Sequence, residues 1–135
     1  MRPAFLALLA DALGQVGRID EGLRAIDEGF AHAERTIEGG PMAELHRVRG
    51  TLLLPRGDRG GAEAGFRAAV DYAQRQQTRS FELRAATALA RLMAADGRRD
   101  AALEVLSPVY GWFTEGRDTA DLIAARNLLN EIGTP

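Results

Sequence analysis

The chain has 135 residues, of which 46% are hydrophobic and 27% are charged, and its formal net charge is −2. This length fits one domain, and the balanced charge gives no attraction to nucleic acid or to an anionic membrane, so neither is expected as a partner. The sequence contains no cysteine, and all 17 basic residues are arginine. Disulfides, thiolate metal sites and catalysis by a cysteine or lysine side chain are therefore excluded.

A repeat of 40 residues organises the chain, because Gly17, Gly57 and Gly97 stand 40 residues apart. Each glycine is expected to adopt the left-handed conformation and to end a helix. Most columns with the same spacing are apolar or small: Leu9/Arg49/Leu89, Ala10/Gly50/Ala90, Leu13/Leu53/Met93, Gly22/Ala62/Ala102, Ile26/Phe66/Leu106 and Phe30/Val70/Tyr110. Since these positions recur at helical spacing within each copy, each repeat is predicted to be two amphipathic helices.

In chain order, the pattern predicts helices at about 3–16, 20–37, 41–55, 60–77, 80–96, 100–114 and 118–132. The links after the three glycines are so short that the two helices of a pair must be antiparallel. Asp20 and Asp100 are expected to cap the second helix of their pairs. Pro41 suits a first helical turn, and Thr78 or Ser80 is expected to cap the next helix.

The last predicted helix, 118–132, fits the repeat columns poorly and is expected to be a cap that covers the final pair. Its apolar positions are Leu122, Ala125, Leu128, Leu129 and Ile132.

The spacing of small and large residues resembles the tetratricopeptide repeat. The matching residues are Leu6, Leu9, Ala10, Leu13, Gly22 and Ile26 in the first copy, Gly50, Leu53, Ala62 and Phe66 in the second, and Leu89, Ala90, Met93, Ala102 and Leu106 in the third. The period departs from the usual value of about 34, and the usual proline after the second helix is missing. HEAT and armadillo repeats have periods near 40 but lack this spacing.

This resemblance implies an all-α fold, namely a right-handed α-solenoid of three tetratricopeptide-like helix hairpins and a C-terminal capping helix, with about seven helices in all. The hairpins are expected at about 3–39, 41–79 and 80–116, followed by the cap at 118–132, all within a single domain, 1–135.

A second resemblance covers most of the chain, including the stretch at 17–22 and the segment from Pro108 to Gly116 followed by Asp118, Thr119, Asp121 and Leu122. These residues resemble the C-terminal repeat regions of large bacterial regulators, which carry an ATPase module and often a nucleotide-cyclase or DNA-binding domain. The resemblance implies a protein-binding scaffold from a signalling or transcription regulator. A small-molecule sensor is the alternative.

Candidate catalytic groups are few, and none has the surroundings that catalysis requires. His32 and His46 are the two histidines, and neither serine lies in a nucleophile motif. His46 occupies a core position of the repeat, so a partly buried, hydrogen-bonded ring is expected. We therefore expect no enzymatic activity, no cofactor and no metal.

The N-terminal apolar run at residues 4–10 is too short for a signal peptide, and too short for a membrane span, which needs about 20 apolar residues. Leu6, Leu9 and Ala10 fit the repeat columns instead. A cytoplasmic location is expected.

The concave face is expected to be lined by the first helix of each pair, and it is the predicted binding groove. Its outward positions are Asp11, Arg47, Thr51, Arg84, Thr87 and Arg91, with Arg126 extending the row from the cap helix. Guanidinium groups grip carboxylates in bidentate fashion, so an acidic peptide or C-terminus is the predicted ligand. The alternative is that these arginines are solvated or paired with nearby acids.

Further apolar columns, Phe5/Leu45/Ala85, Leu8/Val48/Ala88 and Ala12/Leu52/Leu92, should face the preceding repeat. In the first repeat this edge, formed by Phe5, Leu8 and Ala12, has no predicted cover. Leaving Phe5 and Leu8 in water forfeits about 1.5–3 kcal/mol each. We therefore expect either homo-oligomerisation through the first helix or packing against upstream repeats of a longer parent protein.

Aromatic side chains gather near the last helix, at Tyr110, Trp112 and Phe113. The cluster is expected to seal the final repeat, and a platform on which a ligand stacks is the alternative.

Overall fold

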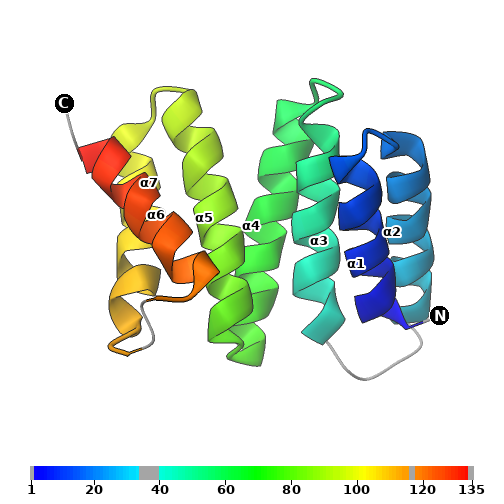
Figure 1. Ribbon diagram of the computed structural model, residues 1–135, viewed down its shortest axis with the longest axis horizontal. Coiled ribbons are helices and arrows are strands. Elements are labelled where there is room, and N and C mark those ends of the chain that lie inside the picture. The colour runs from blue at the N-terminus through cyan, green and yellow to red at the C-terminus, as the bar shows by residue number, and fades with distance from the viewer. Residues whose placement is uncertain (1, 34–39, 116–117, 134–135) are drawn as a thin grey trace.

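The computed structural model describes residues 2–33, 40–115 and 118–133. Within these ranges the chain forms seven helices and no strand, which confirms the all-α class. The helices are α1 (Pro3–Gln15), α2 (Ile19–Ala33), α3 (Gly40–Leu53), α4 (Arg59–Gln76), α5 (Arg79–Ala95), α6 (Arg99–Trp112) and α7 (Ala120–Gly133) (Figure 1). Their ends agree with the predicted ends within about two residues. The predicted end of the second helix, at 37, lies outside the described residues.

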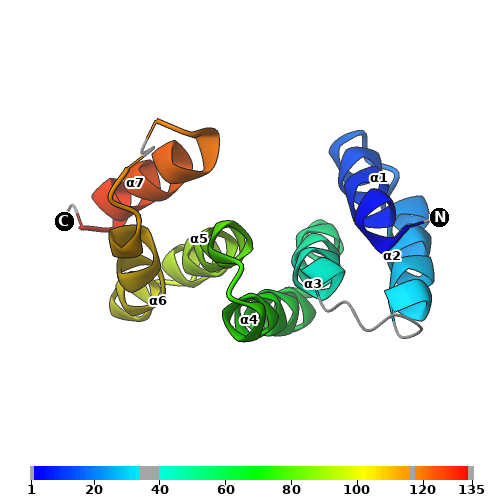
Figure 2. The same ribbon diagram turned by 90° about the horizontal axis from the view of Figure 1, so that it is seen from below.

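The helices pack in antiparallel pairs that follow one another in a curved row. Each odd-numbered helix after α1 contacts both helices of the pair before it: α3 packs on α1 and α2, α5 on α3 and α4, and α7 on α5 and α6. Figure 2 shows α1, α3, α5 and α7 along the inner side of the arc, with α2, α4 and α6 along the outer side. The inner side is thus built from the predicted first helix of each pair.

The turn inside each pair has the same backbone geometry, as the 40-residue spacing predicts. Gly17, Gly57 and Gly97 have φ values of +83°, +78° and +82°, which confirms the left-handed conformation. In each turn the amide that follows the glycine donates to the carbonyl five residues earlier: Arg18 to Leu13 at 2.8 Å, Asp58 to Leu53 at 3.1 Å and Arg98 to Met93 at 2.9 Å. This bond closes the first helix and reverses the chain.

The predicted caps are wrong in detail, because the second helix of each pair begins one residue earlier than expected. Asp20 and Asp100 therefore lie within the first turns of α2 and α6, where a carboxylate still interacts favourably with the helix dipole. Asp58 caps α4, and its Oδ1 accepts a hydrogen bond of 2.9 Å from the Gly61 amide.

The predicted cap of α5 also differs. Thr78 stands at the cap position, but its hydroxyl donates to the Ala73 carbonyl at the end of α4, at 3.3 Å. Ser80 lies inside α5. The hydroxyl at this junction therefore closes the preceding helix instead of opening the next one.

Equivalent positions on the second helix of each pair share the same burial, whereas the Leu9/Arg49/Leu89 column does not, since Leu9 is 36% exposed and Leu89 is 2% exposed. Ile26, Phe66 and Leu106 are each at most 1% exposed, and Ala62 and Ala102 are fully buried. Small residues permit the close approach of paired helices: a Cβ on Gly50 would lie 2.9 Å from the Ala62 carbonyl oxygen. The first pair packs around one cluster shared with α3, and a second cluster runs from α3 to α7.

The last helix, α7, keeps the repeat register more closely than the sequence suggested. Its buried residues Ala125, Leu128 and Ile132 follow Ala85, Ala88 and Leu92 by 40 positions. They pack against α5 and α6, as α5 packs against the pair before it. The poor fit of this helix to the columns arises on its other side, where polar residues replace core positions.

Candidate functional site

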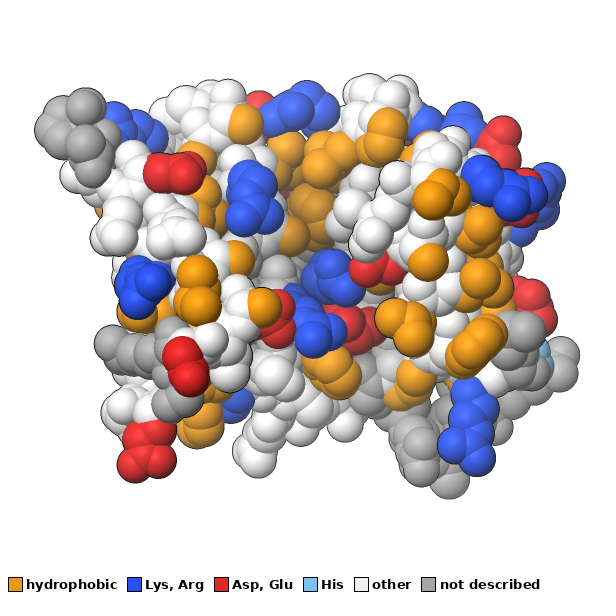
Figure 3. Space-filling model, in the orientation of Figure 1, with side chains coloured by type: hydrophobic (Ala, Val, Ile, Leu, Met, Phe, Trp, Pro, Cys, Tyr) orange, Lys and Arg blue, Asp and Glu red, His pale blue; other side chains and the backbone are white. Residues whose placement is uncertain are grey.

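The inner face of the arc carries a cavity of about 520 Å³. Six of the seven residues predicted for the groove line it, namely Asp11, Arg47, Thr51, Arg84, Thr87 and Arg91. Arg126, the seventh, does not line this cavity and is exposed on α7. Figure 3, which views this face, shows arginine and acidic side chains gathered at its middle.

A second cavity of about 440 Å³ adjoins the first, because Leu8, Asp11, Arg47 and Arg84 line both. The walls of the second cavity also include apolar side chains, Ala4, Ala7, Pro41, Val48 and Phe81. The two cavities together form one groove along α1, α3, α5 and α7. We call it the concave groove. Its end beside α1 is mainly apolar, and its middle is charged.

Two of the arginines in the groove, Arg47 and Arg84, are already paired with acids of the chain. Arg84 donates from Nη1 to Glu44 Oε1 at 2.9 Å and from Nε to Asp121 Oδ2 at 2.7 Å. Arg47 Nε donates to Glu44 Oε2 at 2.7 Å. The hydrogen bonds from Arg84 to the two carboxylates raise the pKa of Arg84 above its ordinary value, and the bond to Asp121 has the larger effect. This network ties α3, α5 and α7 together across the groove.

Because of this network, Arg47 and Arg84 are not free to bind an acidic ligand, as the alternative interpretation of the sequence expected. The Arg47 and Glu44 side chains are 18% and 15% exposed, so their pair is mostly withdrawn from solvent. Glu44 and Asp121 were missed in the sequence. Glu44 stands one period of 40 before Arg84, and this spacing was the available signal, because positions one period apart lie side by side on neighbouring inner helices.

The other polar residues of the groove are of two kinds: some form side-chain hydrogen bonds within the chain, and some do not. Thr51 and Thr87 each donate their hydroxyl to the carbonyl four residues earlier, at 3.2 Å and 2.7 Å. Asp11 and Arg91 make no ion pair or side-chain hydrogen bond with the described residues. They are therefore the charged groups of the groove that are available to a ligand.

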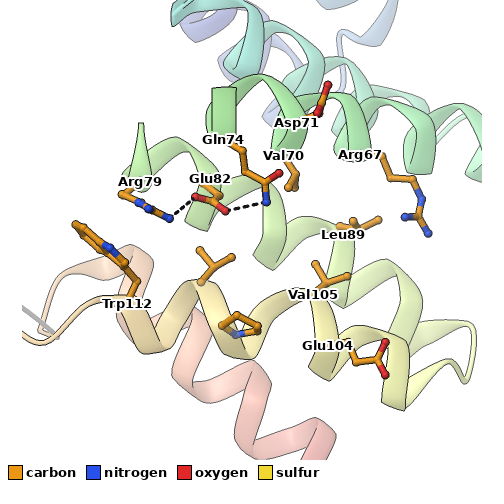
Figure 4. Close-up of a pocket in the computed structure, with 12 residues that line it drawn as sticks. Arg67, Val70, Asp71, Gln74, Arg79, Glu82, Leu89, Glu104, Val105 and Trp112 are labelled. Carbon is orange, nitrogen blue, oxygen red and sulfur yellow. Dashed lines mark hydrogen bonds and ion pairs between the residues drawn. The ribbon is translucent and has the colours of Figure 1, made fainter. Parts of the chain in front are cut away.

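The outer side of the arc has a cleft of about 380 Å³ between α4, α5 and α6 (Figure 4). Glu82, only 3% exposed, lies in it and accepts hydrogen bonds from Gln74 Nε2 at 3.1 Å and from Arg79 Nη1 at 3.3 Å. The Arg79 guanidinium lies 4.8 Å from the centre of the Trp112 ring. Figure 4 shows these four side chains side by side at one end of the cleft.

The expectation for the aromatic cluster holds for Tyr110 and Phe113, which are partly buried and pack against the core, but not for Trp112. Its side chain is 54% exposed and meets the Phe113 ring edge-on at 5.1 Å. The last pair of helices is covered instead by α7. Trp112 thus remains accessible at the end of the cleft.

One repeat earlier, the space between α2 and α4 that is equivalent to this cleft is filled by the ring of His46 from α3. Its ring lies 4.7 Å from that of Phe30 and stacks at 5.4 Å on Tyr72. The ring is half-buried as expected, but it makes no hydrogen bond to a described residue. Burial, and secondarily the charge of Arg49, lower the pKa of His46 below its ordinary value of 6.5. A stack of rings therefore occupies the space that is an open cleft beside Trp112.

Two further classes of site are not found in the described part of the chain. Its acidic residues and histidines nowhere gather in a group of three or more that could hold a metal ion. No helix among these residues is long and apolar enough to cross a membrane.

Comparison with known proteins yields one weak similarity. The sequence matches no protein-family model, and no solved structure matches it. It is similar to an uncharacterized protein of Rhizobium meliloti (strain 1021), with 32% identity over 97 residues. The matched segment covers 71% of this chain but only 9% of that protein. The chain thus spans less than a tenth of the length of its relative.

Proposed function

We propose that this chain is a protein-binding scaffold, a right-handed α-solenoid of tetratricopeptide-like hairpins that holds a segment of a partner protein in the concave groove. The repeated glycine turns and the constant packing of each odd helix on the preceding pair support the solenoid. We place it in the cytoplasm, as the repeat region of a bacterial signalling or transcription regulator. The similarity to a segment of a much longer bacterial protein supports only the part of this proposal that places the repeats in a longer bacterial chain.

The observation that carries the proposal is the continuity of the groove across four helices. An extended peptide lying along α1, α3, α5 and α7 would meet apolar walls at Leu8, Val48 and Phe81, then charged groups near Arg91. A groove with an apolar anchor site and a few polar groups fits peptide recognition.

The chemistry of the ligand follows from the groups that remain available. Arg47 and Arg84 already hold carboxylates of the chain, whereas Arg91, like Asp11, has no described partner, and Arg91 is the cation of the two. A carboxylate of the partner would therefore pair with Arg91, next to a bulky apolar side chain in the pocket lined by Leu8 and Phe81. An acidic segment with one apolar anchor is the proposed ligand class.

Selection from a random-peptide display library on the purified chain tests the proposal. We expect enriched peptides to combine an acidic and a bulky apolar residue. Arg91→Ala should weaken their binding about tenfold, roughly the effect of losing one charge-assisted contact. Arg126→Ala is the matched control, because Arg126 is exposed but lies outside both cavities. Failure to enrich any peptide, or equal affinity for wild type and Arg91→Ala, would contradict the proposal.

The outer cleft supports a second candidate, a small-molecule sensor. A buried carboxylate, Glu82, and an exposed indole, Trp112, face one cation, Arg79, and this arrangement also suits a cationic metabolite. Trp112 is the single tryptophan, so its fluorescence reports on the cleft directly. A saturable change with a panel of amines and guanidines, lost in Glu82→Gln, would favour this function. A flat response across the panel would remove it.

A further inference from the structure

One side of α1 is apolar and exposed, with no described helix covering it. Phe5, Leu8, Leu9 and Val16 are 52%, 68%, 36% and 71% exposed. They are four of the five large hydrophobic side chains exposed in the described part of the chain, the fifth being Trp112. With Ala12 they fall at helical spacing on one side of α1 and its end, which is the pattern of a buried helix face. We call Phe5, Leu8, Leu9, Ala12 and Val16 the N-terminal face.

The columns of Phe5, Leu8 and Ala12 are buried or half-buried in every later odd-numbered helix, whereas the columns of Leu9 and Val16 pass through the exposed Arg49 and Arg56. Leu45, Val48 and Leu52, one period after Phe5, Leu8 and Ala12, are at most 1% exposed. The next two copies on α5 and α7 repeat the burial, with Ala85 at 1%, Leu92 at 4%, Ala125 at 0%, Leu128 at 5% and Ile132 at 4%. In each case the preceding helix pair supplies the cover. Only the first copy lacks one among the described residues.

The cover inside the molecule has a definite shape. A Cβ on Gly14 would lie 2.5 Å from Leu52 Cδ2, and one on Gly29 would lie 2.6 Å from Leu45 Cδ2. Gly22 likewise leaves space beside Leu52. The leucines of α3 therefore fit into sockets that glycines open on the α1–α2 pair. A cover for the N-terminal face needs a similar row of small residues on two antiparallel helices.

A second copy of this chain does not offer such a row in head-to-tail stacking. The side of α5 and α6 that would receive it is already covered by α7. On α7 the positions equivalent to the buried Ala86 and Ala90 are Arg126 and Asn130, both exposed. The C-terminal end is thus closed by polar side chains, whereas the N-terminal end is apolar.

We infer that the N-terminal face is the docking surface for a further helix hairpin of the same repeat type, with a glycine- and alanine-rich side, that precedes α1 in the same polypeptide. The relative supports this source, since the matched segment is only 9% of its length. The interface continues the one that α3 and α5 already make with the pairs before them. The inference does not depend on what the concave groove binds.

Placing a hairpin in register on the full chain tests the inference. A copy of residues 1–40 joined ahead of residue 1 restores the period of 40 and reuses the natural link. The readout is hydrogen exchange of amides in the original α1, measured by mass spectrometry. We expect their exchange to slow by about tenfold or more, because the helix changes from an end to an interior position. Phe5→Glu in the original α1 should abolish this slowing, and Phe5 lies outside both cavities of the concave groove.

A second hairpin guards against a poor fit of the first. A copy of residues 41–80 joined in the same way presents the side on which α5 packs. Unchanged exchange of the original α1 in both extended chains would overturn the inference. So would a concentration-dependent dimer of the 135-residue chain that Phe5→Glu converts to monomer, because the occupant would then be a second copy.

Discussion

At the scale of single residues, the glycine at each turn is required by its backbone conformation and not by crowding. A Cβ on Gly57 would meet nothing within 4 Å, yet its φ is +78°. A side chain there is strained by the left-handed conformation alone. Gly60, three residues later, also has open space but lies in the first turn of α4 without a positive φ. A comparison of Gly57 with Gly60 therefore distinguishes backbone strain from steric crowding as the reason for glycine.

Gly57→Ala should therefore lower the free energy of unfolding by about 1 kcal/mol. Gly60→Ala should leave it unchanged or raise it, because alanine is the better helix former. Urea denaturation of both variants beside the wild type gives the comparison. If the two substitutions have equal effects, the left-handed turn is not what selects glycine at position 57.

The ring stack around His46 predicts a pH dependence. Burial and Arg49 lower the folded-state pKa of His46 below 6.5, so between that value and 6.5 the unfolded chain binds more protons than the folded one. The contribution of His46 to the free energy of unfolding is then fully present above about pH 6.5 and is lost as the pH falls below this value. His46→Phe keeps the ring between Phe30 and Tyr72 but cannot titrate.

Urea midpoints at about pH 7.5 and 5.5 measure this effect. The wild type should lose stability over this interval. His46→Phe should lose less. A loss in His46→Phe as large as that in the wild type would assign the pH dependence to carboxylates elsewhere.

At the scale of helices, burial along one column decides what a substitution does. Leu8 on α1 and Leu52 on α3 both belong to the side that faces the preceding pair, yet Leu8 is 68% exposed and Leu52 is 1% exposed. The first has no described cover, and the second fits against Gly14 and Gly22. The same change of side chain at both positions thus compares an open edge with a packed one.

Leu52→Ala should cost about 2–5 kcal/mol of unfolding free energy, since it leaves a cavity between α3 and the first pair. Leu8→Ala should change the unfolding free energy by less than about 0.5 kcal/mol. Thermal or urea unfolding of the two variants measures the difference. Similar losses at both sites would mean that the N-terminal face is covered in solution.

The sequence predicts the helices well because each signal is local or periodic. Gly17, Gly57 and Gly97 mark the turns, and the 40-residue columns fix which side of each helix is buried. The caps were less predictable, because Thr78 can bond either to the helix before it or to the helix after it. Its hydroxyl chooses the Ala73 carbonyl, and only the three-dimensional junction decides this.

The position of the groove could be predicted from the sequence, but the ion pairs formed by its side chains could not. Helical spacing places Arg47, Arg84 and Arg91 on the inner side, but the pairing of Arg84 with Asp121 depends on where α7 packs. The sequence also gave no reason to separate Arg91 from the other two. Side-chain pairing across helices depends on rotamers and on distances that a periodic pattern does not contain.

At the scale of the whole molecule, ion pairs link successive helix pairs at both the groove and the turns. Arg84 bridges Glu44 and Asp121 across the inner face. Near the turns, Arg59 pairs with Asp96 and Arg98 with Glu63. The two residues of each ion pair come from neighbouring helix pairs, so these contacts help to set the angle between successive helix pairs.

A double-mutant cycle on Arg84→Ala and Glu44→Gln should give a coupling energy of about 0.5 kcal/mol at low salt, because Arg84 is partly exposed and solvent screens the pair. The coupling should shrink in about 1 M salt. Urea unfolding of the four chains at both salt concentrations measures it. A coupling that does not respond to salt would contradict an exposed electrostatic link.

Removal of one full period tests the central claim, that interchangeable helix pairs stack at a step of 40 residues, most directly. In a chain lacking residues 41–80, α5 would follow α2 and place Ala85, Ala88 and Leu92 where Leu45, Val48 and Leu52 pack now. We predict that circular dichroism shows undiminished helicity per residue and a cooperative unfolding transition. Collapse of the in-register deletion to an unfolded or non-cooperative state would contradict the account.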